Sequence, residues 1–178
     1  MAQRKKTTGP ARKAPRAKRA AKARVAILMG SPNDGAVMQA AADVLSELGV
    51  GSDVRVISAH RTPARHQRYV KSAEGRGIEV FICGAGMAAH LAGVTAALTP
   101  LPVLGVPLDG SALNGLDALL ATVQMPGGIP VATFAIGKAG AKNAGIFAAQ
   151  ILATKDAAVK RSLAAFRERQ TANVPQRP

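Results

Sequence analysis

Short, uninterrupted runs of apolar residues alternate along this chain with longer segments in which apolar residues recur at helical spacing. Runs this short are typical of strands buried on both faces of a parallel sheet, with helices connecting them. Strands are predicted over residues 25–29, 53–57, 80–83, 103–106 and 131–136, and helices near residues 37–48, from 63, 88–98, 115–124, 144–152 and 156–166. The pattern predicts an α/β fold, a three-layer α/β/α sandwich with a C-terminal helix.

The second predicted strand differs from the others, because apolar and charged residues alternate in it from Asp53 to Ile57. Such alternation is typical of a half-exposed strand at the edge of a sheet. With this strand at the edge, we expect a flavodoxin-like parallel five-stranded sheet in the order 2-1-3-4-5. In that order the chain reverses direction between strands 1 and 3, and ligands bind there, beyond the carboxyl ends of the strands.

The positive charge of the chain is concentrated at its N-terminus. The net charge is +14, and residues 1–24 hold ten of the 24 Lys and Arg residues and no acidic residue. We predict a disordered basic tail over residues 1–23, a folded domain over residues 24–169 and a flexible C-terminus over residues 170–178. The tail suits contact with nucleic acid or another polyanion, and it also suits a solvated extension without a role.

The single cysteine, Cys83, excludes an internal disulfide and a zinc site built from several cysteines. It lies in an apolar run, so we predict a buried thiol. No apolar stretch is long enough to span a bilayer, and the N-terminus has no hydrophobic leader segment. We therefore expect a reducing, cytoplasmic location and no contact with a membrane.

Glycines and polar residues are concentrated in three segments that follow the first, second and third predicted strands. These segments are Gly30–Gly35, Ser58–Pro63 and Gly84–His90. Because the carboxyl ends of parallel strands lie at one edge of the sheet, we expect all three segments to meet in one crevice. Small residues at a helix start expose backbone N–H groups, which favour the binding of a phosphate.

Four side chains in these segments suit a phosphorylated sugar as ligand. Ser31 offers a hydroxyl, Arg61 can bind phosphate oxygens with a pair of N–H groups, and Asp34 can accept hydrogen bonds from ribose hydroxyls. His60 is a candidate for proton transfer, because histidine is the side chain that changes its charge near neutral pH.

Each candidate also has a purely structural interpretation. Ser31 suits an ordinary turn, Asp34 suits a helix cap, and His60 suits a hydrogen-bonded structural histidine. His90 suits a donor to a backbone carbonyl. His66 has charged and amide neighbours in the sequence, so we expect it to face solvent.

Two phosphate-binding motifs are incomplete in this sequence. The segment from Gly84 to Ala89 has the spacing of the dinucleotide fingerprint, but it follows the third strand instead of the first, and the next acid is Asp109. Gly137-Lys138 lacks the other residues of a P-loop. These departures disfavour NAD binding and nucleoside triphosphate hydrolysis. Three histidines without clustered acids leave no predicted metal site.

Six motifs in consistent order resemble the PurE family of purine biosynthesis, over residues 24–169. They read MGSPND, SAHRTP, GAGMAAHLAG, LPVLGVP, VQMPGGIPVATFAIGKAGAKNAG and AAQILAT. The resemblance implies an isomerase that converts N5-carboxyaminoimidazole ribonucleotide to 4-carboxy-5-aminoimidazole ribonucleotide without metal, biotin or ATP. It also implies a homo-octamer with sites near subunit interfaces, and a functional link to the ATP-dependent carboxyaminoimidazole ribonucleotide synthase.

The resemblance assigns roles to particular residues. The general acid and base of the family falls on His60. The substrate-binding positions of the family fall on Ser31, Asp34, Arg61, Ser58, Gly86 and His90. The implied path is decarboxylation of the substrate, retention of the carbon dioxide, and its transfer to ring carbon C4.

The motifs depart from the family pattern at several positions. Asn33 stands where serine is common, Met87 where glycine is common, and Ala92 where proline is common. The pair Asp109-Gly110 also differs from the usual one. Two other functions stay open: a carboxylase of the same family that uses aminoimidazole ribonucleotide and free carbon dioxide, and a polyanion-binding protein that acts through its basic tail.

Overall fold

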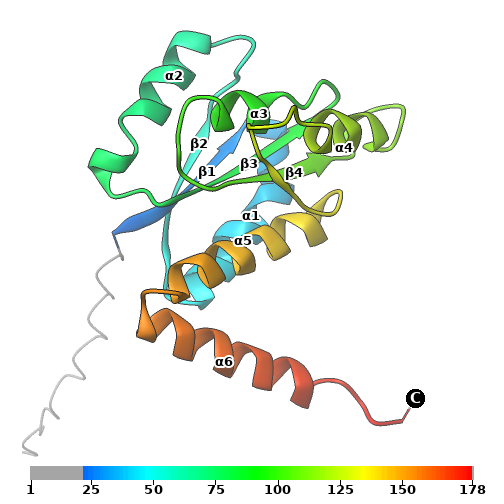
Figure 1. The fold of residues 1–178 in the computed structure, drawn as a ribbon. Helices are drawn as coiled ribbons and strands as arrows, with labels where there is room; N and C mark the ends of the chain where they lie inside the picture. Colours follow the sequence, from blue (N-terminus) through cyan, green and yellow to red (C-terminus); the bar gives the residue numbers. More distant parts are fainter. Residues whose placement is uncertain (1–21, 178) are drawn as a thin grey trace, which may run out of the picture.

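A computed structural model describes residues 22–177 of the protein and shows a three-layer α/β/α sandwich (Figure 1). Five parallel strands form one sheet in the order β2-β1-β3-β4-β5, which confirms the flavodoxin-like arrangement. The strands are β1 (Ala23–Met29), β2 (Gly51–Val56), β3 (Val80–Gly86), β4 (Val103–Leu108) and β5 (Ala132–Thr133).

Helices connect the strands and cover both faces of the sheet. The helical elements are η1 (Pro32–Asp34), α1 (Gly35–Glu47), α2 (Pro63–Lys71), η2 (Glu74–Arg76), α3 (Leu91–Ala96), α4 (Leu116–Val123), α5 (Lys138–Ala153) and α6 (Ala157–Ala172). One layer contains α1 and α5, with α6 packed outside α5, and the other contains α2, α3 and α4 (Figure 1).

Side chains of the central strands alternate between two hydrophobic cores, one on each face of the sheet. In β1, Val25 and Ile27 enter the core shared with α1, α5 and α6, whereas Ala26 and Leu28 enter the core shared with α2 and α3. All four side chains are fully buried. Burial on both faces explains why these strands read as continuous apolar runs in the sequence.

The edge position predicted for the second strand is confirmed. Within the described residues β2 pairs with β1 alone, and its Val54 and Val56 side chains are 44% and 43% exposed. The alternation of charged and apolar residues in the sequence therefore indicates an edge strand, which the hydrophobic core covers only in part.

The fifth strand is shorter than the predicted span of residues 131–136, because its pairing with β4 stops after Thr133. Beyond that point the backbone still follows β4: Phe134 N–H donates to the Gly105 carbonyl and Gly137 N–H to the Pro107 carbonyl, each at 2.9 Å. Pro107 has no N–H group to donate in return. The regular ladder therefore cannot continue past it.

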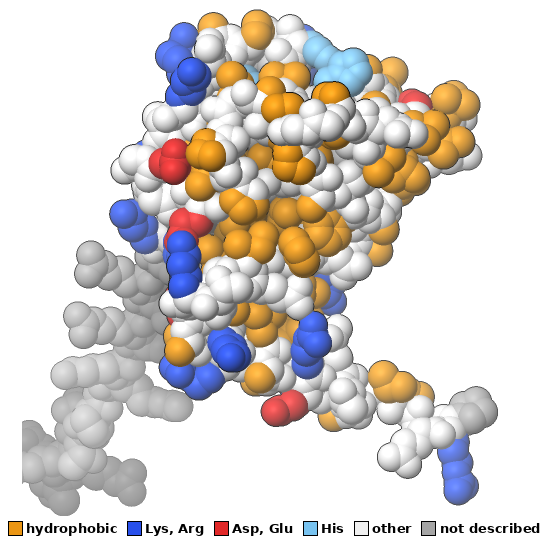
Figure 2. Space-filling view, viewed as in Figure 1, with side chains coloured by type: hydrophobic (Ala, Val, Ile, Leu, Met, Phe, Trp, Pro, Cys, Tyr) orange, Lys and Arg blue, Asp and Glu red, His pale blue; other side chains and the backbone are white. Residues whose placement is uncertain are grey.

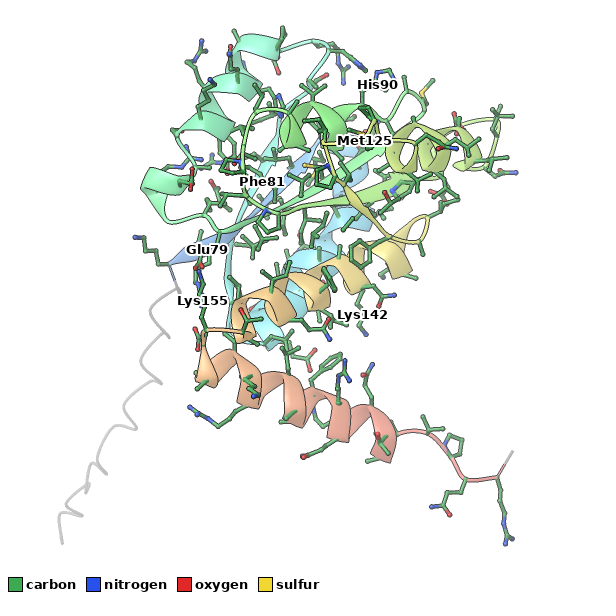
Figure 3. All side chains as sticks on the ribbon, in the orientation of Figure 1. Glu79, Phe81, His90, Met125, Lys142 and Lys155 are labelled. Carbon is green, nitrogen blue, oxygen red and sulfur yellow. The ribbon has the colours of Figure 1, made fainter. Side chains whose placement is uncertain are left out.

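Ion pairs join β1, β3 and the start of α6 at the end of the sheet opposite to the carboxyl ends of the strands. Arg24 contacts Glu79 and Asp156, each at 2.6 Å, and Lys155 contacts Glu79 at 2.6 Å (Figure 3). The Asp156 carboxylate also accepts hydrogen bonds from the first N–H groups of α6, which fixes where this helix begins.

The predicted limits of the folded domain differ slightly from the observed elements. Helix α6 continues to Ala172, three residues past the predicted limit at residue 169. The tail predicted over residues 1–23 lies outside the described residues, apart from Lys22 and Ala23. In the described part of the chain, no helix has the length and apolar character needed to cross a membrane.

Candidate active site

A cleft of about 610 Å³ opens at the carboxyl ends of β1, β2 and β3, where the strand order reverses. All three predicted segments contribute to its walls. The predicted site residues that line it are Ser31, Asp34, Ser58, His60, Arg61 and Gly86. The remaining predicted residue, His90, is hydrogen-bonded to His60. The structure therefore brings all of these residues together, in a cleft whose volume suits a small organic ligand.

The first segment is held in shape by hydrogen bonds within its own turn. The Ser31 hydroxyl accepts a hydrogen bond from Asn33 N–H at 3.3 Å, and Asp34 Oδ2 accepts one from Ser31 N–H at 2.9 Å. Burial raises the pKa of Asp34, although backbone N–H groups of Ser31 and Gly30 and the charge of Arg61 oppose this shift. Ser31 and Asp34 thus shape the turn as reciprocal partners around η1, whereas Asp34 makes no side-chain capping bond at the start of α1; both residues also line the cleft.

Arg61 connects the segments that follow β1 and β2. Its Nη2 atom donates to the Gly30 carbonyl at 2.7 Å. Its backbone N–H and its Nε atom donate to the Ser58 hydroxyl at 3.1 and 3.4 Å. A guanidinium carries five N–H donors, and these side-chain bonds use two of them. The remaining donors are held at the cleft, where they can bind an anionic group.

His60 and His90 form a pair of imidazoles at the cleft. Nε2 of His60 lies 2.9 Å from Nδ1 of His90, and the two rings are nearly perpendicular, at 89°. Both rings are exposed, and Figure 3 shows His90 beside α3 at the end of the molecule distant from α6. The Nδ1 atom of His90 therefore pairs with an imidazole and not with a backbone carbonyl. A hydrogen-bonded pair of imidazoles can pass a proton from one ring to the other.

His66 is buried, so the prediction that it faces solvent is wrong. It is 1% exposed, and its Nε2 lies 2.8 Å from the Thr95 hydroxyl. This hydroxyl donates to the Leu91 carbonyl at 2.7 Å, so Nε2 of His66 is the donor to Thr95. Burial lowers the pKa of His66. His66 and Val70, four residues apart, are both buried on one face of α2, and this spacing is the sequence signal that indicates the orientation of His66.

Residues at the carboxyl end of β4 also line the cleft, and sequence reasoning missed them. They are Leu108, the last residue of β4, and Gly110, two residues beyond it. Because β4 pairs directly with β3, its carboxyl end lies at the same edge of the sheet. The predicted strand order already places strand 4 beside strand 3, so it indicates that this fourth segment reaches the site.

Two other kinds of reactive group come into question, a metal site and the thiol of Cys83. Within residues 22–177 no group of three His, Cys, Asp or Glu side chains is arranged to hold a metal ion. Cys83 is buried, as predicted, and burial raises its pKa to about 12. A thiol with so high a pKa is a poor nucleophile at neutral pH. The histidine pair is thus the main group at the cleft that can move protons.

The fold and the cleft define the class of this protein: a flavodoxin-like α/β protein with a ligand site at the reversal of strand order. Comparisons with known proteins narrow the class. The sequence model of the AIR carboxylase family matches residues 24–173. The chain therefore belongs to this family, which is also called PurE.

Individual relatives agree with this assignment. The chain is 53% identical over 154 residues to the N5-carboxyaminoimidazole ribonucleotide mutase of Brucella melitensis, covering 86% of this chain and 95% of the relative. It is 54% identical over 156 residues to that of Escherichia coli K12, covering 88% and 92%. The crystal structure of Treponema denticola PurE superposes with a TM-score of 0.76 at 26% identity, covering 83% of this chain and 91% of that one.

Proposed function

We propose that this protein is an N5-carboxyaminoimidazole ribonucleotide mutase of purine biosynthesis, which moves a carboxyl group from the exocyclic nitrogen of an aminoimidazole ribonucleotide to ring carbon C4. The curated relatives carry this name at 53% and 54% identity over nearly their whole length. The observation that carries the proposal within the chain itself is the 2.9 Å contact between His60 and His90 in the common cleft.

The cleft offers a suitable group for each part of the nucleotide. The phosphate fits beside the backbone N–H groups of the turn at Ser31 and the free donors of Arg61. The ribose hydroxyls fit beside the Asp34 carboxylate. In this orientation the imidazole ring of the substrate points toward the third segment and the histidine pair.

The reaction requires one proton to be given and one to be taken back. His60 donates a proton to the exocyclic nitrogen as the N–CO₂ bond breaks, which leaves an amine and carbon dioxide. Ring carbon C4 then attacks the carbon dioxide, and neutral His60 removes the C4 proton to restore the aromatic ring. His90, hydrogen-bonded to His60, holds the ring in place through this cycle. Because the carbon dioxide is retained beside C4, the two reacting groups are already close together, which accelerates the second step.

An assay of the purified protein tests this function. We expect conversion of N5-carboxyaminoimidazole ribonucleotide to the C4-carboxylated product without ATP or added metal. Conversion of aminoimidazole ribonucleotide with bicarbonate, and none of the N-carboxylated substrate, would instead assign the protein to the carboxylases of the family. Both substrates are offered at matched concentrations, and the His60→Asn variant serves as the blank.

We further propose that the protein assembles as a homo-octamer and acts in the cytoplasm after the ATP-dependent synthase that makes its substrate. Large apolar side chains on and beside α4 support an assembly, because Leu116, Leu120 and Val123 form an exposed stripe on that helix. Figure 2 shows hydrophobic side chains gathered at the end of the molecule that carries α4. Light scattering of the purified protein should give the mass of eight chains, whereas a monomer would contradict the proposal.

A further inference from the structure

The positive charge of the folded domain is concentrated in one segment. Residues 51–76, which form β2, α2 and η2, hold six basic and two acidic side chains, whereas the rest of residues 25–177 holds eight of each. The net charge of +4 in this part of the chain therefore belongs to the edge of the sandwich formed by β2 and α2 (Figure 1). A local excess of positive charge attracts anions.

This segment also forms a second cleft, of about 370 Å³. The residues that line it are Asp53, Arg55, Val56, Ile57, Arg65, Tyr69 and Arg76. Ile57 enters the hydrophobic core, whereas Asp53 and Arg55, at alternate positions before it on the same face of the strand, carry charges. At the edge of the sheet a charged cleft therefore takes the place of apolar core. The first and second clefts share no lining residue.

The acidic side chain of the second cleft is already paired. Asp53 Oδ1 lies 2.8 Å from Nε of Arg55, and Asp53 Oδ2 accepts a hydrogen bond from the Tyr69 hydroxyl at 2.8 Å. Burial and the hydrogen bond to Asp53 raise the pKa of Tyr69, so its hydroxyl stays protonated and remains the donor. The negative charge of Asp53 is thus compensated by Arg55, and two further arginines face the same cleft.

Arg76 is held in a fixed position at this cleft. Its Nη1 atom donates to the Ser72 hydroxyl at 2.7 Å and its Nη2 atom to the Tyr69 carbonyl at 3.3 Å. Its guanidinium lies 4.2 Å from the centre of the Tyr69 ring. Among residues 22–177, no acidic side chain forms an ion pair with Arg65 or Arg76. A guanidinium that is already ordered loses less side-chain entropy when it binds an anion.

We propose that the second cleft is a binding site for phosphate, either as the free ion or as the phosphate group of a small ester, with Arg65 and Arg76 as donors. Guanidinium groups bind phosphate oxygens through pairs of N–H groups. Three arginines and one aspartate give the cleft a net charge of +2, which matches a phosphate dianion. Its volume suits a small ligand. The site is separate from the cleft assigned to the substrate and does not depend on the proposed function.

Isothermal titration calorimetry with inorganic phosphate tests this site. The first cleft also suits a phosphate group, so the titrations use the full-length Arg61→Ala protein, in which that cleft is weakened, at constant ionic strength. Adding Arg65→Gln should weaken phosphate binding about tenfold, because a charged hydrogen bond is lost. Arg65 is exposed, so this change should leave folding intact. Arg68→Gln is the matched control: Arg68 is also exposed on α2 but lines neither cleft, and its replacement should leave the affinity unchanged.

Asp53→Asn in the same background should change the affinity in the opposite direction. Asparagine keeps an acceptor for the Tyr69 hydroxyl, but it removes a negative charge and releases Arg55, so we expect phosphate to bind about fivefold more tightly. Ribose 5-phosphate is titrated in parallel: tighter binding than inorganic phosphate identifies an ester as the ligand, and weaker binding identifies the free ion.

Two results would overturn the proposal. One is the absence of saturable phosphate binding in the Arg61→Ala protein. The other is binding that neither Arg65→Gln nor Asp53→Asn alters. These titrations require no turnover, so failure of the proposed function would leave their outcome unchanged.

Discussion

The three histidines of the chain differ in their surroundings, and the surroundings decide which of them can move protons. His60 lines the cleft and is hydrogen-bonded to His90, and both side chains are exposed, so His60 is the histidine placed to exchange a proton with a bound ligand. His66 is buried among apolar residues, where a positive charge is costly, and it serves as a neutral donor to Thr95. Burial and hydrogen-bond partners thus separate the two histidines proposed for the site from the one that links two helices.

Replacing His60 with asparagine should separate catalysis from binding. Asparagine can still hydrogen-bond to His90 but cannot carry a proton at neutral pH, so we expect turnover to fall by about 10²–10⁴-fold. Nucleotide affinity, measured by isothermal titration calorimetry, should change little. Turnover at the level of the parent protein would remove His60 from the mechanism, and circular dichroism serves to show that the variant is folded.

Replacing Arg61 with alanine should weaken nucleotide binding more than it slows the chemical step. The variant loses charged hydrogen bonds to the ligand and the bond to the Gly30 carbonyl, so we expect KM to rise by about 10–100-fold. Arg68→Ala is the matched control, because Arg68 is an exposed arginine on α2 that does not line the cleft. An unchanged KM for Arg61→Ala would exclude its proposed role.

At the scale of elements, the hydrogen bond between His66 and Thr95 links α2 to α3, the two helices that follow His60 and His90. Because burial lowers the pKa of His66 below 6.5, the unfolded chain binds more protons than the folded one as the pH falls below 6.5. The contribution of this residue to stability is therefore full above pH 6.5 and declines as the pH falls toward the lowered folded-state pKa.

His66→Leu should remove this part of the pH dependence. Urea denaturation between about pH 5 and pH 7.5 gives the free energy of unfolding at each pH. We expect the slope of the parent below pH 6.5 to exceed that of the variant. Parallel pH profiles for the two proteins would show that His66 titrates equally in the folded and unfolded states.

Close packing between β3 and α1 gives a second prediction at this scale. A Cβ atom at Gly84 would lie 2.3 Å from the Sδ atom of Met38, whose side chain is fully buried and has little room to move. Gly84→Ala should therefore lower the free energy of unfolding by about 1–3 kcal/mol. At Gly75 a Cβ meets nothing within 4 Å, so Gly75→Ala should change stability by less than about 0.5 kcal/mol. Equal stability of both variants would contradict this packing argument.

The sequence predicted strands and helices well where burial leaves a periodic pattern. The continuous run in β1 and the alternation in β2 identified a central and an edge strand, and both positions are confirmed. The predicted length of β5 was wrong, because the residues of this strand do not show that Pro107 on the neighbouring strand β4 lacks a backbone N–H donor. His66 was misjudged because its charged sequence neighbours concealed the buried face of α2.

At the scale of the whole molecule, the site exists because parallel strands deliver their loops to one edge of the sheet. The topology alone placed three segments together, and the structure adds a fourth after β4. The contact between His60 and His90 could not be predicted, because it depends on how two loops from different strands are oriented, and no local pattern records that orientation.

A crystal structure of the His60→Asn variant with the product nucleotide bound tests the central claim most directly. The claim predicts the phosphate at the turn containing Ser31 and at Arg61, with the carboxylate on ring carbon C4 within hydrogen-bond reach of residue 60. A nucleotide bound only elsewhere, for example in the smaller cleft lined by Arg55 and Tyr69, or bound here with its ring directed away from residue 60, would contradict the account.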